Sequence, residues 1–141
     1  MQNINEMRLD FPAIPENEGF ARMVISAFLV QVNPTMSVVS EVRTAVSEAV
    51  TNAIVHGYAG TTGTFVLRAQ IESDQAVIEV EDYGCGIADV QKAMQPFYTS
   101  HPEQERTGIG FSLMQSFMDG VSVTSSPGSG TLVRMTKRLE T

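Results

Sequence analysis

Two glycines in the sequence TGIGF (107–111) could form a phosphate-binding site. They lie where a polar stretch, residues 98–108, gives way to a stretch with helical periodicity. The first N–H groups of a helix have no partner within the helix, and a residue without a Cβ lets a phosphate approach them closely. Glycines also punctuate ordinary loops, so Gly108 and Gly110 need support from other parts of the chain.

An acidic residue is expected at a core-facing position of a strand. In AVIEVED (76–82), alternate apolar residues share one face, and Asp82 is the next residue on that face. A buried carboxylate is costly unless it is hydrogen-bonded or lies at the mouth of a pocket. Gly84 and Gly86 follow directly and allow a tight turn close to a ligand. The same letters are also an ordinary turn sequence.

Glu48 and Asn52 are a third polar feature, one helical turn apart in SEAVTNAIVHGY (47–58). At roughly 100° per residue, they lie within about 40° of each other and away from the valines of the same helix. Taken alone, the pair is also what a solvated helix face looks like. Its meaning depends on where the other motifs lie.

These residues are spread over an expected order of strand, two helices, two strands, helix, loop, helix and two strands. The expected ranges are 7–11, 16–32, 35–57, 64–73, 76–82, 89–95, 98–108, 109–119, 121–125 and 131–137. Thr35 or Ser37 can cap the second helix, which ends at Gly57. The order predicts an α+β fold, a two-layer sandwich with a mixed, mostly antiparallel sheet and its helices on one face.

The two long helices have apolar stripes that should face the sheet. In the first helix the spacing indicates Phe20, Val24, Ala27 and Phe28. In the second helix it indicates Val39, Val42, Val46, Ala49, Val50 and Ala53. The strand at 64–73 should bury Phe65, Leu67, Ala69 and Ile71.

The composition fits one globular domain that spans residues 1–141. The longest apolar stretch, 20–32, contains Arg22 and is too short to span a bilayer, so we expect no membrane partner. The lone cysteine, Cys85, favours a reducing, cytoplasmic location. The net charge of −7, without a basic cluster, argues against direct nucleic-acid binding. It fits solubility alone, or a basic protein partner.

Taken in order, the motifs resemble the Bergerat ATP-binding superfamily, also called GHKL, which includes DNA gyrase B, Hsp90, histidine kinases and MutL. The fourth motif is Gly-Thr at 130–131. Nearly the whole chain is also similar to one branch, the sporulation anti-sigma factors that are serine protein kinases. The matching stretches are ENEGFAR (16–22), NPTM (33–36), VSEAVTNAIVHGY (46–58), EDYGCGI (81–87), ERTGIGF (105–111) and FMD (117–119).

The resemblance implies a site for ATP or ADP with Mg²⁺. Asn52 would coordinate Mg²⁺, Glu48 would be the general base, and Asp82 would accept a hydrogen bond from the adenine amino group. Arg106 would be a second catalytic residue at the γ-phosphate, or else a solvated charge of the ATP lid at 98–108. The other ATP-binding residues would be Gly84, Gly86, Ile87, Thr99, Ser100, Thr107, Gly108, Ile109, Gly110, Phe111 and Thr131. His101 stands in the lid where relatives would have a lysine.

The resemblance also implies protein partners. The protein would inhibit the sporulation sigma factor sigma-F in an ATP-dependent manner and phosphorylate a serine of its anti-anti-sigma antagonist. Arg22 would contact both partners, or else it lies at the edge of the core with its stem buried. A homodimer is expected, because helix 16–32 carries more apolar surface than one contact with a sheet needs.

Three alternatives remain on sequence grounds. The protein could be a kinase of the same family that acts on a stress-type sigma factor, or a binding module in which ATP is only a conformational ligand. Retention of both Glu48 and Asn52 argues against the binding module. A stand-alone ATPase of the gyrase or Hsp90 kind would need a transducer domain, for which the sequence has no length.

Overall fold

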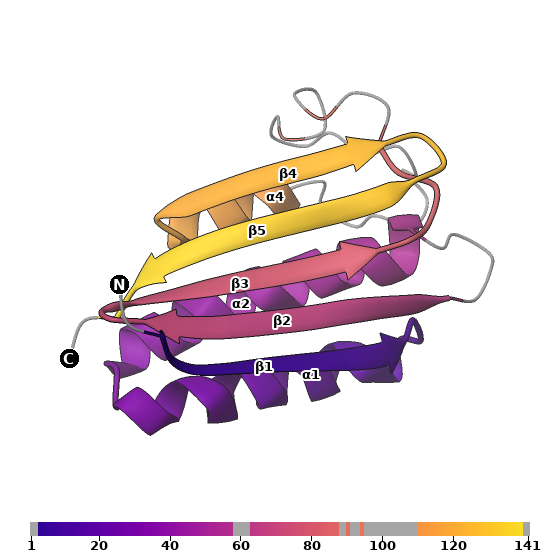
Figure 1. Ribbon diagram of the computed structural model, residues 1–141. Coiled ribbons are helices and arrows are strands. Elements are labelled where there is room, and N and C mark those ends of the chain that lie inside the picture. Colours follow the sequence, from indigo (N-terminus) through magenta and orange to yellow (C-terminus); the bar gives the residue numbers. More distant parts are fainter. Residues whose placement is uncertain (1–2, 58–62, 88–89, 91–93, 95–109, 140–141) are drawn as a thin grey trace.

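Figure 1 shows the computed structural model, which describes residues 3–57, 63–87, 90, 94 and 110–139. The strands are β1 (Asn3–Pro12), β2 (Thr64–Glu72), β3 (Gln75–Asp82), β4 (Gly120–Ser126) and β5 (Gly130–Arg138). The helices are α1 (Glu16–Leu29), α2 (Met36–Asn52) and α4 (Gly110–Phe117), with a 3-10 turn η1 (Val30–Val32) and a π-helical turn η2 (Ala53–Gly57). Most of the short helix expected at 89–95 lies outside the described residues.

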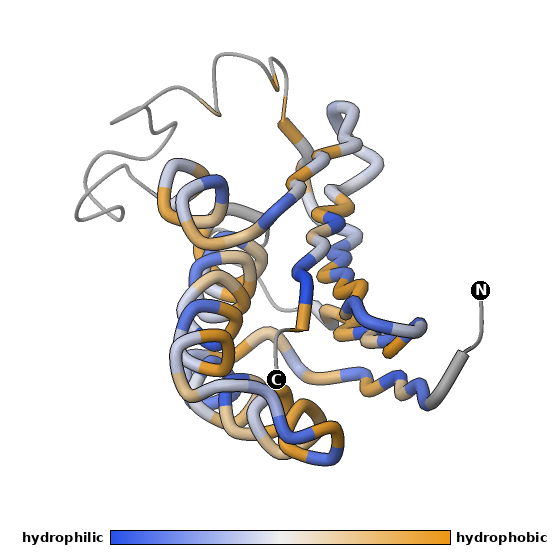
Figure 2. Tube along the Cα trace, turned by 90° about the vertical axis from the view of Figure 1, so that its left-hand side faces the viewer, coloured by the Kyte–Doolittle hydropathy of each residue, from blue (hydrophilic) through white to orange (hydrophobic). Residues whose placement is uncertain are grey.

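The strands form one sheet in the order β1-β2-β3-β5-β4. All four pairings between these described strands are antiparallel. The helices lie on one face of the sheet, and Figure 2 shows the two layers edge-on. The predicted α+β sandwich with its helices on one face is therefore confirmed. None of the helices in the described ranges has the length and apolar composition needed to cross a membrane.

The core between the two layers confirms the stripes predicted for the second helix and for the two central strands. Thr35 caps α2 by accepting a hydrogen bond from the Val38 N–H at 3.2 Å. The five stripe residues within α2 and the sixth, Ala53 at the start of η2, are buried, as are the inward-facing residues of β2 and β3. Burial of these side chains fixes which face of α2 meets the sheet. It therefore also fixes which face points away, the face with Glu48.

The buried face of α1 differs from the prediction. The buried residues are Ala21, Ile25, Phe28 and Leu29. Of the predicted stripe only Phe28 is buried, whereas Phe20 is 55% exposed and packs edge-on against Phe11 with ring centroids 5.3 Å apart. The helix is apolar on two adjacent faces, so its periodicity alone did not determine which face would meet the core.

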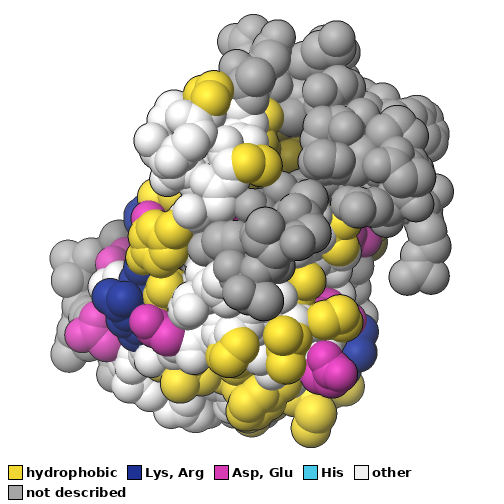
Figure 3. All heavy atoms as spheres, turned by 90° about the vertical axis from the view of Figure 1, so that its right-hand side faces the viewer, with side chains coloured by type: hydrophobic (Ala, Val, Ile, Leu, Met, Phe, Trp, Pro, Cys, Tyr) yellow, Lys and Arg dark blue, Asp and Glu magenta, His cyan; other side chains and the backbone are white. Residues whose placement is uncertain are grey.

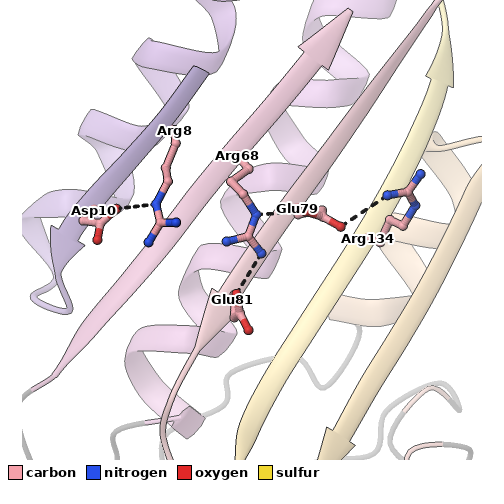
Figure 4. Close-up of polar contacts among 6 residues, drawn as sticks. All are labelled: Arg8, Asp10, Arg68, Glu79, Glu81 and Arg134. Atoms are coloured by element: carbon pink, nitrogen blue, oxygen red, sulfur yellow. Dashed lines mark hydrogen bonds and ion pairs between the residues drawn. The ribbon is translucent and has the colours of Figure 1, made fainter. Parts of the chain in front are cut away.

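The face of the sheet that points away from the helices carries cross-strand ion pairs (Figure 4). Arg68 of β2 donates to Glu79 at 2.9 Å and to Glu81 at 2.7 Å, both on β3. Arg134 of β5 reaches Glu79 at 3.3 Å. Such pairs hold neighbouring strands in register at a solvated surface. The candidate site lies on the opposite, helix-covered side.

Candidate active site

Asp82 lies in a row of residues that crosses the sheet on its helix-covered side. Its neighbours are Phe65 on β2 and Thr131 on β5, and Thr131 in turn pairs with Ser125 on β4. Asp82 is only 5% exposed, and it is the one buried charged residue in the described part of the chain. The prediction that this acid faces the core is confirmed. One end of the row is aromatic, since Phe65 stacks on Phe11 of β1 with ring centroids 5.1 Å apart, whereas Asp82, Thr131 and Ser125 make the other end polar.

The carboxylate of Asp82 is hydrogen-bonded but remains costly to ionise. It accepts the Gly84 N–H at 2.9 Å and a backbone hydrogen bond from Thr131. Burial raises the pKa of Asp82 to about 6, although both backbone hydrogen bonds act in the opposite direction. The group is therefore mainly an ionised acceptor at neutral pH, and it gains a proton within a short interval below that.

The loop after β3 is held against the turn between β4 and β5. Gly86 and Gly130 both have positive φ, at 78° and 88°. A Cβ on Gly86 would collide with the backbone of Ser126, and one on Gly130 would collide with the backbone of Asp82. The Gly128 N–H also donates to the Cys85 carbonyl at 2.7 Å. Packing within the protein itself therefore requires a glycine at position 86, in addition to the predicted close approach to a ligand.

Glu48 and Asn52 meet the start of α4. A Cβ on Gly110, the first residue of that helix, would lie 3.4 Å from Asn52 Nδ2 and 3.5 Å from Glu48 Oε2. Both polar side chains are half-buried, so this face of α2 is no plain solvated surface. The structure therefore brings Glu48 and Asn52 together with Gly110, the second glycine of TGIGF, as the resemblance implies.

A π-helical turn, η2, follows directly after Asn52. The Ala53 N–H is shared between the carbonyls of Ala49 and Val50 at the point where α2 gives way to η2. Such turns are rare and often lie at functional sites. Because η2 packs against β3 and β5, it brings the end of α2 over the strands that carry Asp82 and Thr131. The sequence did not predict this turn, because no residue type in AIVHG indicates it.

Several predicted residues fall outside the described ranges. They are Thr99, Ser100, His101, Arg106, Thr107, Gly108 and Ile109. Phe111 is half-buried and packs against the core, whereas the Ile87 N–H donates to Ser125 Oγ at 2.7 Å. Ser125 was not singled out from the sequence. The strand alternation that placed Asp82 on the core face could also have indicated Ser125, because Ser125 is the next residue on the inward face after Val121 and Val123.

Figure 3 looks at the end of the molecule where β3, β4 and α2 finish. Many of the described side chains visible there are hydrophobic, and the charged groups lie toward the sides of this view.

A groove of about 710 Å³ lies between α1 and α2, and Glu48 is one of its walls. Arg22 and Arg43 line the same groove, one from each helix. The Arg22 side chain is 45% exposed and lies 3.5 Å from Glu18, which accepts a hydrogen bond from Ser47 at 2.6 Å. Arg22 therefore faces this groove. Glu48 touches both the groove and the start of α4, so it separates a surface open to solvent from the predicted phosphate site.

Comparison with known proteins places the fold in a family. A family model described as "Histidine kinase-like ATPase domain" matches residues 11–137. The catalytic domain of the histidine kinase ThkA matches with a TM-score of 0.59 at 13% identity, over 95% of this chain and 97% of that chain. The RsbU and RsbW domains of a Mycobacterium tuberculosis protein match with a TM-score of 0.70 at 18% identity, over 96% of this chain and 32% of that chain. These structures show the fold alone.

The fold and the family match define the class of protein, a histidine kinase-like ATPase domain, which implies a nucleotide site. Within this class, the anti-sigma F factor of Thermoanaerobacter sp. (strain X514) is 50% identical over 137 residues, 97% of this chain and 96% of that protein. The anti-sigma F factor of Bacillus subtilis (strain 168) is 46% identical over 136 residues, 96% of this chain and 93% of that protein. The chain therefore belongs to the anti-sigma F factor family.

Proposed function

We propose that this protein binds and inhibits a sigma-F-type sigma factor when ATP is bound, and that it phosphorylates a serine of an anti-anti-sigma antagonist. Relatives that cover nearly the whole chain and carry the name anti-sigma F factor support the first part. One observation supports the second part, namely the convergence of Glu48 and Asn52 on the first residue of α4. A binding module that used ATP only as a ligand would not need Glu48 at this point.

The residues present fit a nucleotide with Mg²⁺. Asp82 offers a buried acceptor for the adenine amino group, and Asn52 offers a carboxamide oxygen for Mg²⁺. The first turn of α4 begins at Gly110, where N–H groups and the helix dipole favour an anion. From the sequence, Arg106 and the neighbouring lid residues would add contacts to the phosphates.

The chemistry proposed for this chain rests on proton transfer. ATP would supply the phosphoryl group. A serine hydroxyl is a weak nucleophile at neutral pH, so a carboxylate that accepts its proton speeds the transfer. Glu48 would accept that proton at a carboxylate oxygen, because it lies between the open groove and the start of α4. Its position would let the acceptor serine approach from the groove side.

The groove would also bind the protein partners. The chain is acidic overall, with a net charge of −7, yet two arginines line this surface. Arg22 and Arg43 would pair with carboxylates on the partner, and opposite charges placed this way favour association and the correct orientation. Because the sigma factor and its antagonist would share Arg22, they would compete for the groove.

The decisive experiment incubates the protein with radiolabelled Mg-ATP, the sigma factor and the antagonist. We expect label on one serine of the antagonist, and sigma factor retained with ATP but released after the antagonist is added. Arg43→Glu should raise the KM for the antagonist without changing ATP affinity. Sigma binding without any labelled antagonist would contradict the kinase part of the proposal. Labelled antagonist without binding of this sigma factor would point to another sigma factor as the partner.

A further inference from the structure

Ser125 is the centre of a small hydrogen-bond network at the polar end of the cross-sheet row. Its hydroxyl receives the Ile87 N–H at 2.7 Å and donates to the Gly130 carbonyl at 2.8 Å. It also lies 2.8 Å from the Thr131 hydroxyl. One side chain on β4 thus contacts the loop after β3 and the first two residues of β5.

The protons in this network can be assigned by counting donors. A hydroxyl has one proton to donate and two lone pairs that accept. The Gly130 carbonyl can only accept, so it takes the proton of Ser125, and the Ile87 N–H uses one lone pair. The Thr131 hydroxyl must then donate its own proton to the remaining lone pair of Ser125. Its lone pairs stay available to a ligand, but its proton does not.

We propose that Ser125 is a positioning residue that makes the nucleotide site selective for adenine, by committing the Thr131 proton so that Thr131 presents only an acceptor beside Asp82. Thr131 lies between Asp82 and Ser125 in the row. Two neighbouring acceptors match the amino group at position 6 of adenine, which carries two donor hydrogens. They are mismatched to the carbonyl at the same position of hypoxanthine. This inference rests on the proposed role of Asp82 in adenine binding.

Ser125 would also fix the position of the pocket itself. Its bonds to Ile87 and Gly130 connect the loop 83–87 to β5, where Gly86 and Gly130 allow close backbone packing. Removal of the hydroxyl would therefore loosen the loop and free the Thr131 proton. Release of the Thr131 proton changes selectivity between bases, whereas a looser loop weakens binding of every nucleotide. Comparison of two nucleotides with identical phosphates separates the two effects.

The test measures dissociation constants of ATP and ITP by calorimetry for the wild type, Ser125→Ala and Ser125→Thr. The ratio of ITP to ATP dissociation constants should fall on the order of tenfold in Ser125→Ala, the equivalent of one hydrogen bond. Ser125→Thr keeps the hydroxyl and suits a strand, so it should retain most of the ratio. Ser126→Ala, an exposed neighbour on the same strand, is the matched control.

Each outcome is informative. A wild type that binds ATP and ITP equally would contradict the role proposed for Asp82 in adenine recognition, whereas a wild type that binds neither nucleotide would contradict the nucleotide part of the proposed function. A selective wild type whose ratio survives in Ser125→Ala would overturn the role of Ser125 alone. Equal weakening of ATP and ITP, with a lower Tm of the nucleotide-free protein, would make Ser125 merely structural and also overturn the proposal.

If Ser125→Ala does not fold, Thr131→Val provides a second test. Loss of the Thr131 hydroxyl should lower the same ratio, and the further change Ser125→Thr should then leave it unaltered. A ratio that is unchanged in Thr131→Val would overturn the proposal.

Discussion

The charge of the Asp82 side chain is subject to two opposing requirements. Burial among apolar residues of the sheet disfavours its charge, whereas the adenine amino group would need that charge as an acceptor. The outcome is a pKa of about 6, well above the ordinary value for an aspartate. The recognition of adenine should therefore depend on pH in a range where few other carboxylates titrate.

We expect the ratio of ITP to ATP dissociation constants to fall as the pH decreases from 8 to 5, with a midpoint near 6 in the free protein. Protonated Asp82 carries an O–H donor, which suits the carbonyl of hypoxanthine better than the amino group of adenine. The two nucleotides carry the same phosphates, so phosphate titration cancels in the ratio. Asp82→Asn should make the ratio independent of pH. A wild-type ratio that is flat over this range would contradict the assignment of Asp82.

A loss of folding stability cannot explain a loss of base selectivity at low pH, because protonation of Asp82 stabilises the folded protein. The pKa of Asp82 is higher in the folded protein than in the unfolded chain, so between about pH 4 and 6 the folded state binds more protons. The contribution of Asp82 to stability therefore increases as the pH falls through this window and is smallest above it. A loss of selectivity at low pH would reflect the pocket.

Glu48 allows chemistry to be separated from binding. Glu48→Gln keeps the size and hydrogen-bonding reach of the side chain but removes its basicity. We expect ATP affinity and sigma binding to change little, and phosphorylation of the antagonist to slow on the order of 100-fold or more. Single-turnover transfer of label from ATP measures this rate directly. Near wild-type transfer would remove Glu48 as the base, and loss of ATP binding would make it a structural or metal-site residue.

At the scale of elements, the loop 83–87 and the β4–β5 turn act as one unit that shapes the pocket. Gly86 and Gly128 both have positive φ, at 78° and 79°, but only Gly86 is pressed against backbone. Gly128→Ala should cost about 1 kcal/mol of unfolding free energy, the cost of the backbone conformation alone. Gly86→Ala should cost roughly 2 kcal/mol more and weaken ATP binding as well. Equal losses in a denaturant titration would show that the packing of the two segments is unimportant.

The elements also show what sequence could and could not determine. The valine stripe of α2 and the alternation of β2 and β3 were predicted correctly, because each has one clearly apolar face. The same alternation placed Asp82 correctly. The prediction of which face of α1 is buried was wrong, because Phe20 and Ile25 lie on adjacent apolar faces. Tertiary packing determined which of the two faces the core. The π-helical turn η2 and the network of Ser125 depend on contacts between distant segments, which local periodicity does not contain.

At the scale of the molecule, two surfaces bear on assembly: the exposed apolar surface of α1 and the outer edge of β1, which pairs with no other strand among the described residues. β1 is an edge strand of ten residues, and an unpaired edge can add a strand from another chain. On α1, Phe20 is 55% exposed, and Met23, which also lines the edge of the groove between α1 and α2, is 72% exposed. With a net charge of −7 on each copy, association would have to overcome repulsion, so an apolar contact is the natural interface. We propose a two-fold homodimer through α1 and β1.

Met23→Glu should weaken this dimer at least tenfold, because it places a charge within an apolar contact and adds to the repulsion between two acidic copies. The matched control is Met36→Glu at the start of α2, a methionine that is 81% exposed but outside the proposed interface. Sedimentation equilibrium of the protein with ATP, at tens of micromolar, gives the dissociation constants without either protein partner present. Raising the salt concentration should strengthen the wild-type dimer, since screening reduces the repulsion. A wild type that sediments only as a monomer, or equal effects of the two glutamates, would contradict an interface formed by α1.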